Sequence, residues 1–129
     1  MKTTRILFSL PILSLYVWMA GCATNPVSNS TCVYSSGTAM AEYAPPDKHL
    51  HERYPAIIDD YQNFIVKTKG EHPTWWTYSV AIYEDKGGQH AVKLVFETGT
   101  RTYTDFFLMY DKSNTRIQVI KGDTTHASH

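Results

Sequence analysis

Hydrophobic residues recur at helical spacing in the middle of the chain. Between positions 47 and 69 they fall three or four residues apart, which predicts an amphipathic helix with one apolar face. Pro55 interrupts this pattern, because a proline inside a helix removes a hydrogen bond and clashes with the preceding turn. The pattern therefore predicts a short helical turn over residues 47–53 and a main helix over residues 55–68.

After position 74 the pattern changes to the alternation that is typical of strands. Stretches rich in aromatic and β-branched residues are separated by turn signals such as Gly87-Gly88. The predicted strands cover residues 74–83, 91–98, 102–110 and 115–120. One main helix followed by four strands predicts an α+β domain in which the helix packs on a four-stranded antiparallel meander sheet.

Polar segments flank this predicted domain. Residues 22–46 are rich in Ser, Thr, Asn, Ala and Pro, and such a segment buries too little apolar surface to offset the entropy of ordering. We expect a flexible tether over residues 22–46, the α+β domain over residues 47–122 and a disordered tail over residues 123–129.

The first residues have the layout of an export signal. Lys2 and Arg5 precede a short apolar stretch that contains no charge and ends in small residues. This stretch is short for a membrane-spanning helix, which needs about 20 apolar residues, and Pro11 lies inside it. The sequence therefore predicts that residues 1–21 are a cleaved signal peptide.

The end of this signal, Met19-Ala20-Gly21-Cys22, resembles the lipobox of bacterial lipoproteins, which usually reads Leu-Ala-Gly-Cys. The resemblance implies that the thiol of Cys22 carries a diacylglyceryl group and that cleavage occurs just before it. It also implies an N-acyl chain, typically palmitate, on the new N-terminus. Ala23 stands where inner-membrane lipoproteins of enteric-type bacteria carry Asp. By this resemblance the protein is expected at the periplasmic face of the outer membrane.

The chain contains two cysteines, Cys22 and Cys32. In an oxidising periplasm they could instead form one disulfide, which is the interpretation that competes with lipidation of Cys22. Removing Lys2 and Arg5 with the signal leaves ten basic and twelve acidic residues (12 − 2 = 10 basic), a formal charge of −2. Because the chain has no polybasic run, we expect no nucleic-acid partner and membrane contact only through the acyl chains.

The residues that commonly carry chemistry form no recognisable site. His49 and His51 lie on a predicted helix, where side chains two positions apart diverge by about 200°, so a shared metal ion is disfavoured. Asp59 and Asp60 are expected on a solvated helix face. With no nucleophile motif and no glycine-rich phosphate loop, we predict no catalytic residue, no metal, no cofactor and no enzymatic activity.

The aromatic content is high, with nine tyrosines and three tryptophans. If the main helix covers one face of the sheet, the other face displays aromatic side chains, which often anchor protein contacts. The candidate partner-binding residues on that face are Trp75, Tyr83, Tyr103, Phe107 and Met109. An alternative remains that the tether or a second protomer covers this face and that these residues belong to the core.

These observations predict a non-enzymatic lipoprotein that binds a periplasmic or outer-membrane protein. It could serve as a secretion or envelope-assembly accessory, or as an immunity or inhibitor protein, and a homodimer is compatible with the same surface. The rival prediction is a small-ligand or enzymatic pocket between helix and sheet, lined by Tyr54, Tyr61, Trp76 and Tyr78. A large cavity with convergent polar groups would favour this pocket.

Overall fold

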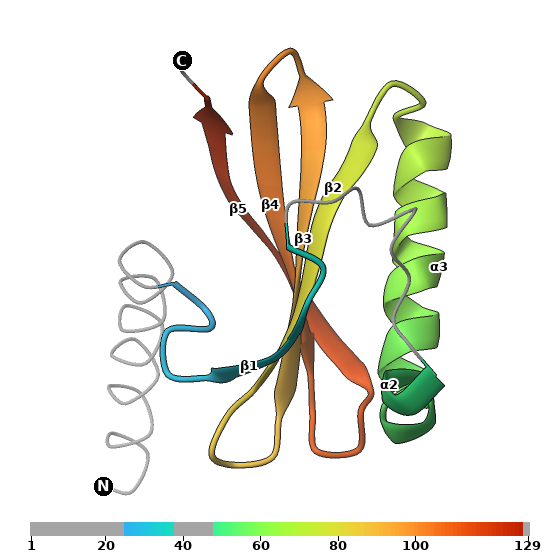
Figure 1. The fold of residues 1–129 in the computed structure, drawn as a ribbon, viewed down its shortest axis with the longest axis vertical. Coiled ribbons are helices and arrows are strands. Elements are labelled where there is room, and N and C mark those ends of the chain that lie inside the picture. Colours follow the sequence, from blue (N-terminus) through green and yellow to red (C-terminus); the bar gives the residue numbers. More distant parts are fainter. Residues whose placement is uncertain (1–24, 38–47, 128–129) are drawn as a thin grey trace, which may run out of the picture.

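The computed structural model of the chain describes residues 25–37 and 48–127. It contains five strands and two helices (Figure 1). In chain order they are β1 (Thr31–Ser35), α2 (Lys48–Arg53), α3 (Pro55–Glu71), β2 (Trp76–Glu84), β3 (His90–Gly99), β4 (Thr102–Tyr110) and β5 (Arg116–His126).

The five strands form one antiparallel sheet in which spatial order follows chain order, from β1 to β5. Short turns join the strands from β2 onward. In the β2–β3 turn the side chain of Asp85 accepts hydrogen bonds from the backbone N–H groups of Gly87 and Gln89, at 2.8 and 2.9 Å. Asp111 plays the same part in the β4–β5 turn. These side-chain bonds close the turns that the sequence predicted.

The prediction of a four-stranded sheet with one main helix is wrong. The sheet has a fifth strand, β1, drawn from residues assigned to the flexible tether, and β5 continues to His126, beyond the predicted end at residue 120. β1 pairs antiparallel with β2, which lies far along the chain, from Thr31 opposite Glu84 to Ser35 opposite Ala81. The composition of a segment reports only on nearby residues, so it does not predict pairing with a strand that lies far along the chain. The resulting domain is mostly sheet.

The helices begin and end close to the prediction. α2 and α3 are separated at Tyr54, whose N–H still donates to the carbonyl of Leu50 at 2.8 Å. Pro55 is the first residue of α3, where the N–H that it lacks would have no helical partner. The proline therefore separates a short helix from a long one at little cost.

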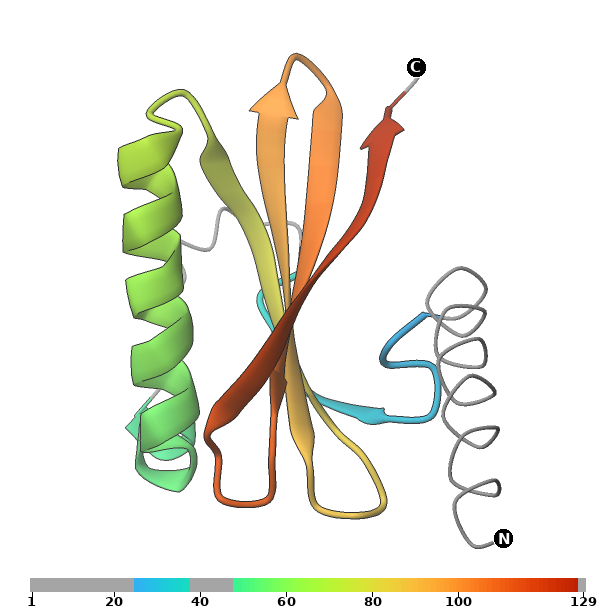
Figure 2. The ribbon, with the colours of Figure 1, turned by 180° about the vertical axis from the view of Figure 1, so that it is seen from behind.

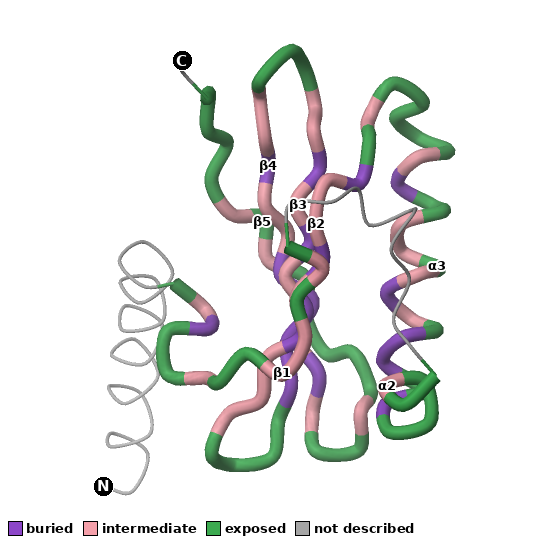
Figure 3. Tube along the Cα trace, in the orientation of Figure 1, coloured by how far each residue is buried: buried purple, intermediate pink, exposed green. Residues whose placement is uncertain are grey.

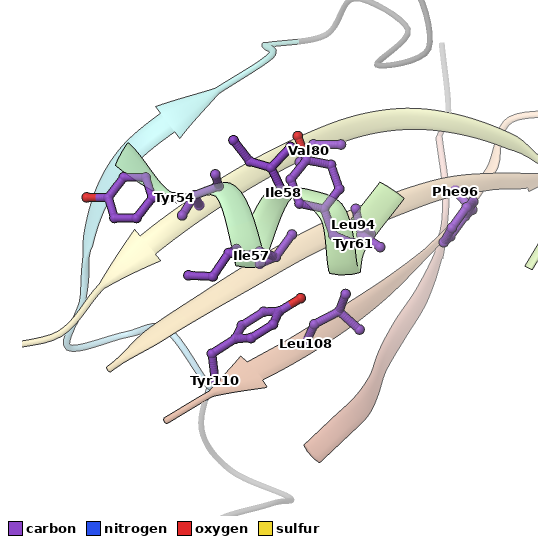
Figure 4. Close-up of a cluster of buried hydrophobic side chains, with 11 residues drawn as sticks. Tyr54, Ile57, Ile58, Tyr61, Val80, Leu94, Phe96, Leu108 and Tyr110 are labelled. Atoms are coloured by element: carbon purple, nitrogen blue, oxygen red, sulfur yellow. The ribbon is translucent and has the colours of Figure 1, made fainter. Parts of the chain in front are cut away.

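α3 packs on one face of the sheet and makes the main core with it (Figures 1 and 2). The helix side contributes the buried residues Tyr54, Ile57, Ile58 and Tyr61, and the sheet contributes Val80, Ile82, Val92, Leu94, Phe96, Leu108 and Tyr110 (Figure 4). This apolar stripe at helical spacing is the one that the sequence predicted. We call this side of the sheet the helix face.

The opposite side, the far face, carries a second and smaller core. Residues 25–30 turn across it and bury Val27, which is 6% exposed, against Ala91 and Phe107. Tyr83, Met109 and Ile120 pack around this cluster. Both faces of the sheet are therefore covered, the helix face by α3 and part of the far face by the segment that precedes β1.

Candidate functional site

The five predicted partner-binding residues do not form one exposed patch. Phe107 is only 4% exposed because Val27 covers it, and Tyr83 and Met109 pack beside the same cluster. For these three residues the alternative interpretation, in which the preceding segment covers the far face, describes the packing. They contribute mainly to the second core.

Trp75 lies on the other side of the sheet from these residues. Its ring packs 5.8 Å from that of Phe96 and 6.3 Å from that of Phe106, and it stacks on His72 at 3.9 Å. The prediction was wrong because β2 begins only at Trp76 and contains an irregularity between Thr77 and Ser79. A β-bulge shifts the alternation of side chains, so simple counting assigns the wrong face.

The same irregularity separates the residues of the rival pocket. Tyr54 and Tyr61 are buried in the main core, whereas Trp76 is 43% exposed beneath the ammonium group of Lys69. Tyr78 packs against Tyr103 with their ring centres 4.8 Å apart. The predicted pocket between helix and sheet is therefore not assembled.

A hollow of about 230 Å³ lies elsewhere, beside the segment that covers the far face. Its lining includes Pro26, Ser30, Gln89, Met109, Ile117 and Gln118. Small-molecule sites usually enclose about 300–1,000 Å³ and have a few convergent polar groups. This hollow is smaller, and its lining mixes the exposed side chain of Ile117 with the buried side chains of His90 and Tyr110.

A polar cluster joins α3 to the end of the sheet. The hydroxyl of Tyr110, a residue 1% exposed, donates a 2.6 Å hydrogen bond to the carboxylate of Asp60, and Nε of Arg116 lies 3.4 Å from the same carboxylate. Burial of the phenol, and then its bond to Asp60, raise the pKa of Tyr110. Asp59 is exposed as predicted, but Asp60 is half-buried, and its carboxylate connects α3 to Tyr110 of β4 and Arg116 of β5.

The histidines are distributed rather than clustered. His49 and His51 are exposed on α2. His90 is 8% exposed, with Nε2 3.3 Å from a carboxylate oxygen of Glu84 and its ring 5.0 Å from that of Tyr54. Within residues 25–37 and 48–127, no three His, Cys, Asp or Glu side chains gather closely enough to hold a metal ion.

The most accessible element of the sheet is its last strand. β5 lies at the edge of the sheet, and all its residues are exposed except the half-buried Ile120 and Gly122 (Figure 3). Two aliphatic side chains stand out on it, Ile117 at 60% exposed and Val119 at 43%. The other edge, β1, has only five residues. The predicted strand ended at residue 120 and so did not reveal this edge, although Thr124 and Thr125 are residue types that favour strands.

The proposed signal peptide, Cys22 and Ala23 lie outside the described residues. Among the helices of the described part, none is long and apolar enough to cross a membrane. No protein-family model, curated protein or solved structure matches this chain.

Proposed function

We propose that this protein is a lipoprotein of the outer membrane, anchored through Cys22 on the periplasmic side, whose domain binds another protein and catalyses no reaction. The observation that carries the binding function is the exposed edge of β5, which is 11 residues long. An edge strand presents unpaired backbone N–H and C=O groups and can accept an added strand from another chain.

β5 has two devices that protect such an edge, a register irregularity on each side of its central part and the charge of Lys121, but the part between the irregularities pairs regularly with β4. β5 is long, since strands commonly have five or six residues, and it contains no proline. Its stretch from Ile117 to Ile120 carries no charge, and Arg116 before it is directed toward Asp60. Backbone pairing along this stretch would meet no desolvated charge, and Val119 would supply an apolar contact.

A protein partner is favoured over a small ligand by the shape of the surface. The hollow on the far face is small, and the residues predicted to line a pocket are buried or dispersed. An extended edge instead suits a polypeptide. Both uses inferred from the sequence need such a contact, whether the protein assists assembly of an envelope component or neutralises a toxin or hydrolase.

The anchor is tested by replacing Cys22 with Ser. The variant should move from the membrane fraction to the soluble periplasmic fraction, whereas Cys32→Ser, the matched control, should stay with the outer membrane on a density gradient. Unchanged fractionation of Cys22→Ser would contradict the lipoprotein proposal.

The binding edge is tested by placing a photo-crosslinking amino acid at Val119 in living cells. Val66 on α3 is the matched control, because it is also an exposed valine, at 70%. We expect a discrete crosslinked protein from position 119 and none from position 66. The edge proposal fails if position 119 gives no adduct, or if both positions give the same one.

A further inference from the structure

The lipid-bearing residue and the folded domain are separated by a very short link. Asn25 is already part of the fold, because its side-chain oxygen accepts a hydrogen bond from the Val27 N–H at 3.0 Å and its carbonyl accepts one from Ser28 at 3.1 Å. Only three residue steps join Cys22 to Asn25. At 3.3–3.6 Å per extended residue, their Cα atoms are at most about 11 Å apart.

The attachment point is also fixed relative to the sheet. Val27 is buried against Ala91 and Phe107, so residues 25–30 are held on the far face. Figures 1 and 2 show this segment and α3 on opposite sides of the sheet. The short link therefore starts from the side of the molecule that is turned away from α3.

An exposed apolar side chain lies beside this attachment point. Ile117 is 60% exposed and lines the same hollow as Pro26 and Ser30. Aliphatic side chains next to a lipid anchor gain by entering the boundary between headgroups and acyl chains. Asp85 also lines this hollow, and its carboxylate accepts backbone hydrogen bonds within the β2–β3 turn.

We propose that the anchored domain rests directly on the bilayer, with the far face and Ile117 toward the lipid headgroups and α3 toward the aqueous periplasm. This orientation rests on the proposed lipidation of Cys22. In this orientation the domain is not held away from the membrane by a 25-residue tether over residues 22–46, as the sequence suggested. The edge of β5 then runs alongside the membrane surface, where it can meet a partner that is itself held at that surface.

The orientation is tested on the full lipidated protein, reconstituted into phosphatidylethanolamine and phosphatidylglycerol vesicles that contain a spin-labelled lipid. A fluorophore is attached to Ile117→Cys or to the matched control Val66→Cys, each in a Cys32→Ser background. Lipidated Cys22 is a thioether and does not react with the label. We expect several-fold stronger quenching by the lipid label at position 117 than at position 66.

Flotation of the same vesicles separates the two proposals. If the protein fails to float, lipid anchoring is wrong, and the orientation falls with it. If it floats but position 117 is quenched no more than position 66, the anchor stands and the orientation is wrong. Gln118, which lines the same hollow, supplies a second label site should Ile117→Cys fail to fold, with the same outcomes.

Discussion

Tyr110 shows how much a single side chain contributes to joining the layers of this fold. Its hydroxyl donates to Asp60 from a fully buried position. Tyr110→Phe keeps the ring and removes this bond to a charged group, so we expect a loss of about 1–2 kcal/mol in the free energy of unfolding. Urea denaturation measures it, and Tyr103→Phe is the control, since the half-buried phenol of Tyr103 faces Tyr78. Equal losses in the two variants would show that the Asp60 bond contributes nothing specific.

Buried tyrosines also set the behaviour of the protein in alkali. Burial is the main cause that raises the pKa of both Tyr61 and Tyr110 above the ordinary value of 10.0. In the unfolded chain these phenols ionise near pH 10, while in the folded chain they keep their protons to higher pH. The unfolded state therefore binds fewer protons above pH 10, and stability falls as the pH rises further.

We expect these two tyrosines to leave the urea midpoint of unfolding unchanged between pH 8 and about pH 9.5. Above pH 10 they should make the midpoint fall. Tyr110→Phe removes one of the two groups, so its midpoint should fall less steeply with pH. An equal slope in the variant and the parent protein would exclude Tyr110 as a source of the alkaline loss.

At the scale of elements, the segment before β1 acts as part of the domain. Phe107 is buried under Val27, so Phe107→Ala should cost about 3 kcal/mol or more, as truncation of a buried aromatic does. Val66→Ala on the exposed side of α3 is the control and should change stability by less than about 0.5 kcal/mol. Thermal denaturation compares them. If Phe107→Ala lowers the free energy of unfolding by less than about 1 kcal/mol, Phe107 belongs to the exposed aromatic patch that the sequence suggested.

The elements that sequence analysis located are those whose pattern is local. The stripe over residues 55–68, the turn at Gly87-Gly88 and the alternation of β3 all fix their structure from nearby residues. β1 was missed because its five residues lie in a segment rich in polar and small residues, and they form a strand through pairing with β2. The position of Trp75 was missed because a bulge in the neighbouring strand cannot be read from alternation. The candidate binding edge could not be predicted for the same reason, because strand pairing and bulges both depend on residues that are far apart in the chain.

For the molecule as a whole, lipidation of Cys22 and a Cys22–Cys32 disulfide predict different covalent states of the mature chain. Lipidation of Cys22 leaves Cys32 as the one thiol, and Cys32 is exposed on β1, with its Sγ donating to the Tyr34 carbonyl at 3.2 Å. We therefore expect native protein taken from membranes to react with one equivalent of a thiol reagent and to carry the mass of its acyl groups. The competing Cys22–Cys32 disulfide predicts no reactive thiol before reduction, two after it, and no added lipid mass.

Because the link to Asn25 is so short, the lipidated form would also keep the exposed thiol of Cys32 near the membrane surface, where lipid-soluble thiol reagents should modify it faster than in Cys22→Ser.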